Sequence, residues 1–169
     1  MKVPLSWLKE YIEITLDPHE IARLLTFAGL EVESINFIGL PQPDQLQNQT
    51  SIYGLEWDRN NIIVADINKV EHHPNADRLV LAQLYDGEVT HTVLTGAPNL
   101  FQYKDQGELA QPLKVAYARE GAQLYDGHNS NQELITIKRK KIRGVESYSM
   151  ACSEKELGIS DEHEGIIVF

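Results

Sequence analysis

The sequence Ile62-Ile63-Val64-Ala65-Asp66-Ile67-Asn68-Lys69-Val70 is rich in β-branched residues, which are typical of a β-strand. Four further runs of this kind follow, separated by clusters of Gly, Pro, Asn and Asp. We expect these strands at Leu79 to Tyr85, Val89 to Leu94, Leu113 to Ala118 and Leu134 to Ile142. The chain is therefore predicted to be mainly β, with five short strands that close into a small barrel. An oligonucleotide-binding (OB-fold) barrel has this number of strands.

Two short helices are expected before the β region. Residues 5–12 place apolar side chains at helical spacing, and Asp17 with Pro18 has the pattern of an N-cap followed by a first-turn proline. Gly29 stands where a left-handed C-terminal cap is needed. Residues 31–35 then alternate polar and apolar side chains, as a half-buried strand does. These elements predict a small α/β (α+β) unit ahead of the barrel.

The composition changes three times along the chain and so predicts a domain organisation. Residues 1–39 contain the expected helices and the strand after them, and residues 40–61, rich in Pro, Gln and Asn, are expected to form a linker. Residues 62–151 are expected to form the barrel, and residues 152–169 follow it. Within this last segment, Ser153 and Glu156 have the spacing of a capping box, and Gly165 to Phe169 is expected to be a closing strand.

The charge is distributed unevenly. The net charge is −10, yet residues 135–150 carry five cations and one anion. An acidic chain repels phosphate, so a nucleic-acid site would have to lie at this basic run. If the run is one strand, Arg139, Lys141 and Arg143 lie on one face and Lys138, Lys140 and Ile142 on the other. The cations would contact successive phosphates, or they would protect a solvated edge strand from aggregation, and both interpretations stay open.

Hydroxyl and aromatic side chains follow the cations directly. Ser147 and Ser149 could donate to phosphate or ribose oxygens and Tyr148 could stack on a base, although serines in turns more often satisfy their own backbone. The predicted RNA-binding residues are Lys138, Arg139, Lys140, Lys141, Arg143, Ser147, Ser149 and Met150.

Metal binding and catalysis have little support in the sequence. The single Cys152 excludes an internal disulfide and a multi-thiolate metal site, and the adjacent His72 and His73 would point to opposite faces of an extended chain. There is no glycine-rich phosphate loop and no Gly-x-Ser-x-Gly motif. No metal site, cofactor or catalytic residue is therefore predicted for this chain. Because no apolar stretch is long enough for a signal peptide or membrane span, a cytoplasmic location is expected.

Several motifs resemble one family in order and spacing. Met1-Lys2-Val3-Pro4-Leu5-Ser6-Trp7 and Leu25-Thr26-Phe27-Ala28-Gly29-Leu30-Glu31 resemble the start of the β subunit of bacterial-type phenylalanyl-tRNA synthetase. The later motifs that resemble its embedded tRNA-binding barrel are His73-Pro74-Asn75-Ala76-Asp77-Arg78-Leu79, Gly96-Ala97-Pro98-Asn99, Arg143-Gly144-Val145-Glu146-Ser147 and Met150-Ala151-Cys152-Ser153. The resemblance covers nearly the whole chain. The barrel motifs alone are shared with free-standing tRNA-binding proteins, whereas the N-terminal helices favour the phenylalanine enzyme.

This resemblance implies an OB-fold inserted into a small α/β domain, with residues 1–39 as the first half of that domain and residues 152–169 as the start of its second half, which would be truncated. It also implies a non-catalytic tRNA-binding and structural module of a phenylalanine–tRNA ligase. In that family the α subunit performs aminoacylation with ATP and magnesium, and later domains of the β subunit edit mischarged tyrosine. The implied partners are tRNA, the α subunit and the rest of the β chain of an α2β2 enzyme. Two other functions stay open: a subunit-assembly module that binds no RNA, and a free-standing tRNA-binding homodimer.

The sequence departs from the family's pattern at a position inside the predicted site. Ser149 stands where the family usually has glycine. If this position requires a positive φ, the serine would cost about 1 kcal/mol or more.

Overall fold

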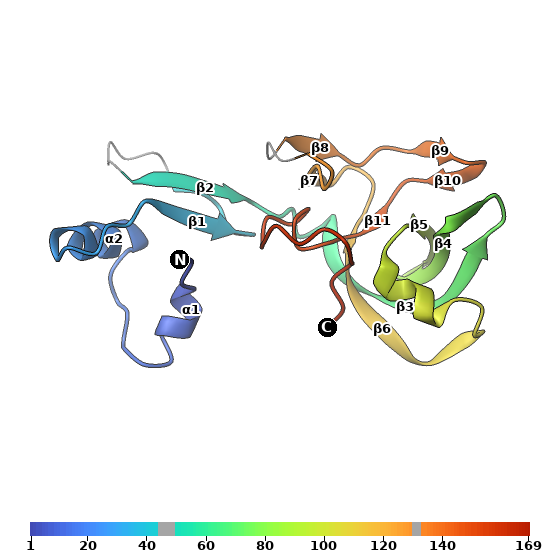
Figure 1. Cartoon of the computed structure of the whole chain (residues 1–169), viewed down its shortest axis with the longest axis horizontal. Helices are drawn as coiled ribbons and strands as arrows, with labels where there is room; N and C mark the ends of the chain where they lie inside the picture. The colour runs from blue at the N-terminus through green and yellow to red at the C-terminus, as the bar shows by residue number, and fades with distance from the viewer. Residues whose placement is uncertain (44–49, 130–132) are drawn as a thin grey trace. The chain divides into compact units, whose positions relative to one another are not determined.

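The computed structural model describes residues 1–43, 50–129 and 133–169. They fall into two compact units, Met1–Phe37 with Gln42–Tyr53, and Ile38–Pro41 with Gly54–Phe169. Figure 1 shows their elements along the chain. None of the helices in the described residues could cross a bilayer.

The first unit contains two helices, α1 (Leu5–Leu8) and α2 (Pro18–Phe27). The predicted N-cap of α2 is confirmed, because the Asp17 carboxylate accepts a hydrogen bond of 2.8 Å from the backbone N–H of His19. Gly29 has a φ of 89°, as predicted for a C-terminal cap. The described residues after α2 include strand β1 (Ser34–Ile38), which pairs with β2 (Ser51–Leu55).

The predicted linker, residues 40–61, is partly folded. Residues 44–49 of it lie outside the described residues, but 51–55 form β2. Trp57 belongs to the second unit, where its indole Nε1 donates a 3.0 Å hydrogen bond to the carbonyl of Leu157. The same ring packs tightly over Gly39, where an added Cβ would lie 2.5 Å from it. The tryptophan of this segment thus has a structural role that the polar composition does not indicate.

The second unit is built on a five-stranded sheet in the order β11-β6-β3-β4-β5, in which every pair is antiparallel. Edge strands β11 and β5 also contact each other, so the sheet curves back on itself. The mainly β class is thereby confirmed, and the arrangement is consistent with an OB-fold-like domain. The strands are β3 (Ile62–His73), β4 (Ala76–Tyr85), β5 (Thr90–Thr95), β6 (Glu108–Ala118) and β11 (Met150–Ala151), with the 3₁₀ helix η1 (Pro98–Tyr103) between β5 and β6.

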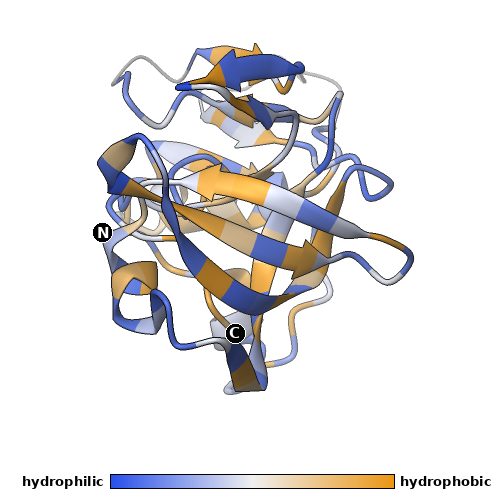
Figure 2. Ribbon diagram, turned by 90° about the vertical axis from the view of Figure 1, so that its right-hand side faces the viewer, coloured by the Kyte–Doolittle hydropathy of each residue, from blue (hydrophilic) through white to orange (hydrophobic). Residues whose placement is uncertain are grey.

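Apolar side chains pack against one another on the buried face of this curved sheet. Figure 2 shows hydrophobic and hydrophilic bands alternating along its strands, as expected when one face is buried. Ile67, Val80, Leu84 and Val93 are fully buried there. A second apolar cluster includes Leu124 and the buried thiol of Cys152. Burial, and secondarily the nearby Glu156 carboxylate, raise the pKa of that thiol well above its ordinary value.

One strand that was predicted to be continuous is interrupted in the structure. Residues 134–142 form two strands, β8 (Leu134–Thr136) and β9 (Lys140–Ile142), and neither belongs to the five-stranded sheet. Strand β8 pairs with β7 (Gln123–Tyr125), and β9 pairs with β10 (Val145–Ser147). The hydrogen bond from the Ile137 N–H to the carbonyl of Ala122 still continues the β7–β8 pairing, whereas the N–H of Arg139 donates to the Glu120 carboxylate, so the backbone changes partner between the two strands. The fifth strand of the sheet is instead β11.

Residues 152–169 pack within the second unit. Ile166 lies in the main core, and Val168 forms an isolated β-bridge with Val115 in place of the expected closing strand. The capping-box hydrogen bonds are present, since Ser153 N–H donates to the Glu156 carboxylate at 2.7 Å, but they close a turn without a helix. The assignment of residues 1–39 and 152–169 to one shared domain stays a prediction.

Candidate nucleic-acid interface

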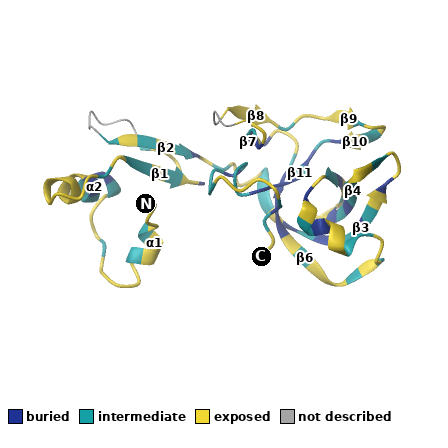
Figure 3. Cartoon of the chain, viewed as in Figure 1, coloured by how far each residue is buried: buried dark blue, intermediate teal, exposed yellow. Residues whose placement is uncertain are grey.

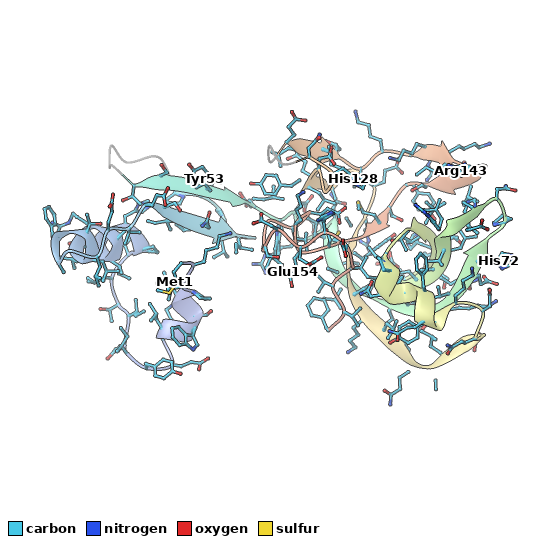
Figure 4. The ribbon with its side chains drawn as sticks, viewed as in Figure 1. Met1, Tyr53, His72, His128, Arg143 and Glu154 are labelled. Atoms are coloured by element: carbon cyan, nitrogen blue, oxygen red, sulfur yellow. The ribbon has the colours of Figure 1, made fainter. Side chains whose placement is uncertain are left out.

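The predicted basic run forms the β9–β10 hairpin and the loop that leads into it. A two-residue turn joins the strands, with Arg143 at φ 49° and Gly144 at φ 93°. Positive φ at both central residues is the geometry of a type I′ turn, which matches the twist of a tight hairpin. Figure 4 labels Arg143 at this tip. The predicted alternation of Arg139, Lys141 and Arg143 on one strand face therefore does not exist, because only Lys141 lies within a strand.

The five cations of the run are exposed to solvent, and Figure 3 shows β8 and β9 as largely exposed ribbon. Four of them have no carboxylate in an ion pair with their side chains within residues 1–43, 50–129 and 133–169. These four are Lys138, Lys140, Lys141 and Arg143. An unpaired, exposed cation keeps its charge available for a phosphate group.

Arg139 is placed differently. Its guanidinium forms ion pairs with Glu146 at 3.2 Å and Glu120 at 3.4 Å. It also lies over the ring of Tyr148, 4.4 Å from the ring centroid. Two carboxylates thus compensate its charge, and the guanidinium covers a face of the aromatic ring that was predicted to stack on a base.

Tyr148 is anchored to the barrel through a partly buried polar cluster. Its hydroxyl is 3.1 Å from Nδ1 of His91, and Nε2 of His91 is 3.0 Å from the Asp86 carboxylate. Arg119 donates to the same carboxylate at 2.8 Å. Burial raises the pKa of Asp86, but hydrogen bonds from the backbone amides of Val89 and Glu88, from His91 and from Arg119 outweigh it and hold the pKa well below its ordinary value. Asp86 is therefore a fixed negative charge.

Ser147, Ser149 and Met150 face inward. Ser147 and Ser149 are 8% and 3% exposed, so neither hydroxyl is free to reach a phosphate in this conformation. Ser149 Oγ lies near the phenol of Tyr117 but outside the geometry of a good hydrogen bond, and Tyr117 itself has a pKa raised mainly by burial. Met150 pairs with Ala118 and packs against the second core cluster. Ser149 does not adopt a positive φ, so the strain considered for this substitution is absent.

The histidines of the β3–β4 turn have local partners. His72 Nδ1 is 3.3 Å from the Asp105 carboxylate, and Nδ1 of His73 accepts a hydrogen bond from the backbone N–H of Asn75. Among the described residues, no group of three or more His, Cys, Asp or Glu side chains could hold a metal ion. The Asn75 side chain in turn donates to the carbonyl of Arg143 at 3.3 Å, which joins this turn to the tip of the basic hairpin.

Sequence reasoning missed three residues that shape this surface: Asn75, Asp86 and His91. Asn75 was named only within a motif that resembles the family, and Asp86 was given no role. His91 lies 57 positions from its partner Tyr148 along the sequence, and no local sequence pattern could predict this contact. Only the folded barrel brings them together.

Comparison with known proteins adds to this geometry. The family described as "Putative tRNA binding domain" matches residues 62–169, which is more than half of the chain. The chain belongs to this family. The match covers the five-stranded sheet and the basic hairpin together.

Whole-chain relatives point to one enzyme subunit. The chain is 44% identical to a phenylalanine–tRNA ligase β subunit of Dehalococcoides mccartyi, strain CBDB1, and 42% identical to that of Protochlamydia amoebophila. It is 38% identical to the β subunit of Bacteroides thetaiotaomicron. Each match covers 99% of this chain but only 17% of the relative. The resemblance to this subunit that the motifs indicated is confirmed, for a segment about one sixth as long as the relatives.

Proposed function

We propose that this chain is a non-catalytic tRNA-binding and structural module of a phenylalanine–tRNA ligase, and that the β9–β10 hairpin is its RNA-binding surface. The observation that carries the proposal is the group of four exposed, unpaired cations on that hairpin and the loop before it, within the segment that matches the tRNA-binding family. The expected partners are tRNA, the α subunit and the rest of a β chain. Aminoacylation, with ATP and magnesium, would belong to the catalytic subunit.

The charge distribution of the chain supports RNA binding that is confined to the hairpin and has modest affinity. The chain carries −10 overall, so it repels a polyanion except near the hairpin. The inward-facing Ser147 and Ser149 leave phosphate contacts from the cations as the main source of affinity. Binding through phosphates weakens steeply with salt, because each neutralised phosphate releases counterions.

The test is a fluorescence-anisotropy titration of unmodified phenylalanine tRNA at several salt concentrations. The wild type should bind with a steep log–log salt slope. A quadruple variant, with Lys138, Lys140, Lys141 and Arg143 replaced by Ala, should reduce that slope by about 0.7 to 0.9 for each phosphate that is no longer neutralised. The matched control replaces four exposed cations elsewhere, Lys2, Lys9, Arg59 and Lys114, by Ala and makes the same change in net charge. If both variants change the slope equally, the hairpin is not the binding surface.

A second function, subunit assembly without RNA binding, is favoured by one observation in the first unit. Leu24, Leu25 and Phe27 of α2 are 43%, 37% and 77% exposed, an apolar surface of the kind that protein partners cover. The titration separates the two functions, since an assembly module would not bind tRNA even at the lowest salt.

A further inference from the structure

Arg139 stands apart from the other cations of the basic hairpin because three groups hold its side chain. Glu120, Glu146 and the ring of Tyr148 surround one guanidinium. Each exposed ion pair contributes little by itself. A planar guanidinium with two carboxylates and an aromatic face has, however, few orientations left, and lysine cannot reproduce this geometry.

The partners of Arg139 tie both sides of the hairpin to the barrel. Glu146 lies on β10 directly opposite Lys141 of β9, and Glu120 follows β6. Tyr148 stands between β10 and β11, and its hydroxyl meets His91 of β5. The Asp86 carboxylate, whose side chain is only 6% exposed, fixes the other nitrogen of His91. A continuous series of interactions therefore runs from the β4–β5 turn to the base of the hairpin.

The tip of the hairpin is held as well. The hydrogen bond from the Asn75 side chain to the Arg143 carbonyl holds the turn formed by Arg143 and Gly144, both of which have positive φ. A Cβ at Gly144 would lie 3.8 Å from Asn75 Nδ2, so the two turns are adjacent. With both ends fixed, the fold sets the position of the backbone from which Lys140, Lys141 and Arg143 extend.

We propose that Arg139 is not a phosphate ligand but the positioning residue of the basic hairpin, acting through Tyr148 and His91 to hold the four free cations in place. This inference rests on the proposed function, because it assigns roles within the same RNA-binding surface. The charge of Arg139 is compensated by two carboxylates, whereas its planar shape fits both carboxylates and the aromatic ring. Shape, and not charge, is therefore the property of Arg139 that matters.

The experiment compares Arg139→Lys, which keeps the charge and removes the planar geometry, with Arg59→Lys, the same substitution at an exposed arginine outside the hairpin and the loop before it. Hydrogen exchange of the backbone amides, measured on the protein without RNA, shows how stably the hairpin is folded. We expect the amides of 140–147 to exchange about fivefold faster in Arg139→Lys and at the wild-type rate in Arg59→Lys. Tyr148→Phe, which keeps the ring and removes only the hydroxyl, should give a smaller increase.

The RNA titration supplies the second readout. Arg139→Lys should weaken tRNA binding severalfold although the net charge is unchanged, and Arg59→Lys should not. Wild-type exchange and wild-type affinity in Arg139→Lys would overturn the inference, since Arg139 would then act only as a charge. If the wild-type protein binds no tRNA, the proposed function fails, and the exchange experiment alone still decides whether Arg139 positions the hairpin.

Discussion

The five-stranded sheet and the β9–β10 hairpin are both antiparallel, yet they are stabilised in different ways. Ile67, Val80 and Leu84 of the sheet are fully buried, so its stability comes from apolar packing. The hairpin has three-residue strands and is held by polar and charged interactions at its base and its tip. We therefore expect that the surface proposed to bind RNA can change without loss of the fold, whereas the sheet cannot.

The largest expected effect is in the sheet. Leu84→Ala removes a fully buried side chain and should lower the free energy of unfolding by about 2–5 kcal/mol, because it reduces apolar burial and leaves a cavity. Leu134→Ala on β8, where the side chain is 55% exposed, is the matched control and should change it by less than about 0.5 kcal/mol. Urea denaturation followed by circular dichroism measures both. Equal effects would mean that the described core does not hold the domain together.

Asp86, which links the two regions, should have the next largest effect. Asp86→Asn removes a charged acceptor of several hydrogen bonds and should destabilise the protein by about 1–3 kcal/mol at neutral pH. Because the pKa of Asp86 is lowered in the folded state, its contribution is present above the unfolded pKa of about 3.9 and is lost as the pH falls through the folded value.

Denaturation at a series of pH values tests this sign. The stability difference between the wild type and Asp86→Asn should be constant above about pH 5 and should shrink below about pH 4. A difference that stays constant down to the lowest accessible pH would show that the carboxylate charge is not the source of the stabilisation.

A smaller effect is expected at the tip of the hairpin. Gly144→Ala places a side chain at φ 93° and should cost about 1–2 kcal/mol of local stability. We expect faster hydrogen exchange in β9 and β10 and weaker tRNA binding, with the thermal unfolding of the barrel little changed. Gly144→Asn should recover part of the stability, since asparagine tolerates this conformation better. Global unfolding caused by Gly144→Ala would remove the distinction between hairpin and sheet.

The smallest expected effect on stability is that of the four free cations themselves. Replacing Lys138, Lys140, Lys141 and Arg143 by Ala removes no described ion pair and should change the melting temperature by no more than about 2 °C. Differential scanning calorimetry measures it. A large decrease would mean that these side chains stabilise the fold and are not free for RNA.

Local patterns predicted the sheet and failed at its connections. The strands of 62–70, 79–85 and 113–118 lie within β3, β4 and β6, because alternation and β-branched residues report burial directly. The run 134–142 was predicted as one strand of the same kind, yet it is interrupted at 137–139, where the pairing partner changes from β7 to β10.

The candidate site shows the same limit. The sequence placed the cations together, and four of them are free at the hairpin. It could not show that Arg139 is paired, because Glu120 lies 19 positions away, or that Ser147 and Ser149 turn inward. Both outcomes depend on how β10 and β11 join the barrel, and that packing is not local.

If RNA binds at the basic hairpin and not elsewhere on this acidic chain, an NMR titration shows it directly. The isotope-labelled protein is titrated with phenylalanine tRNA at low salt and followed through the backbone amides. We expect the largest perturbations at residues 138–147, with smaller changes at Asn75 and His72 near the adjoining turn. Perturbations centred on α2 or spread evenly over the outer face of the sheet, with the hairpin unchanged, would contradict it.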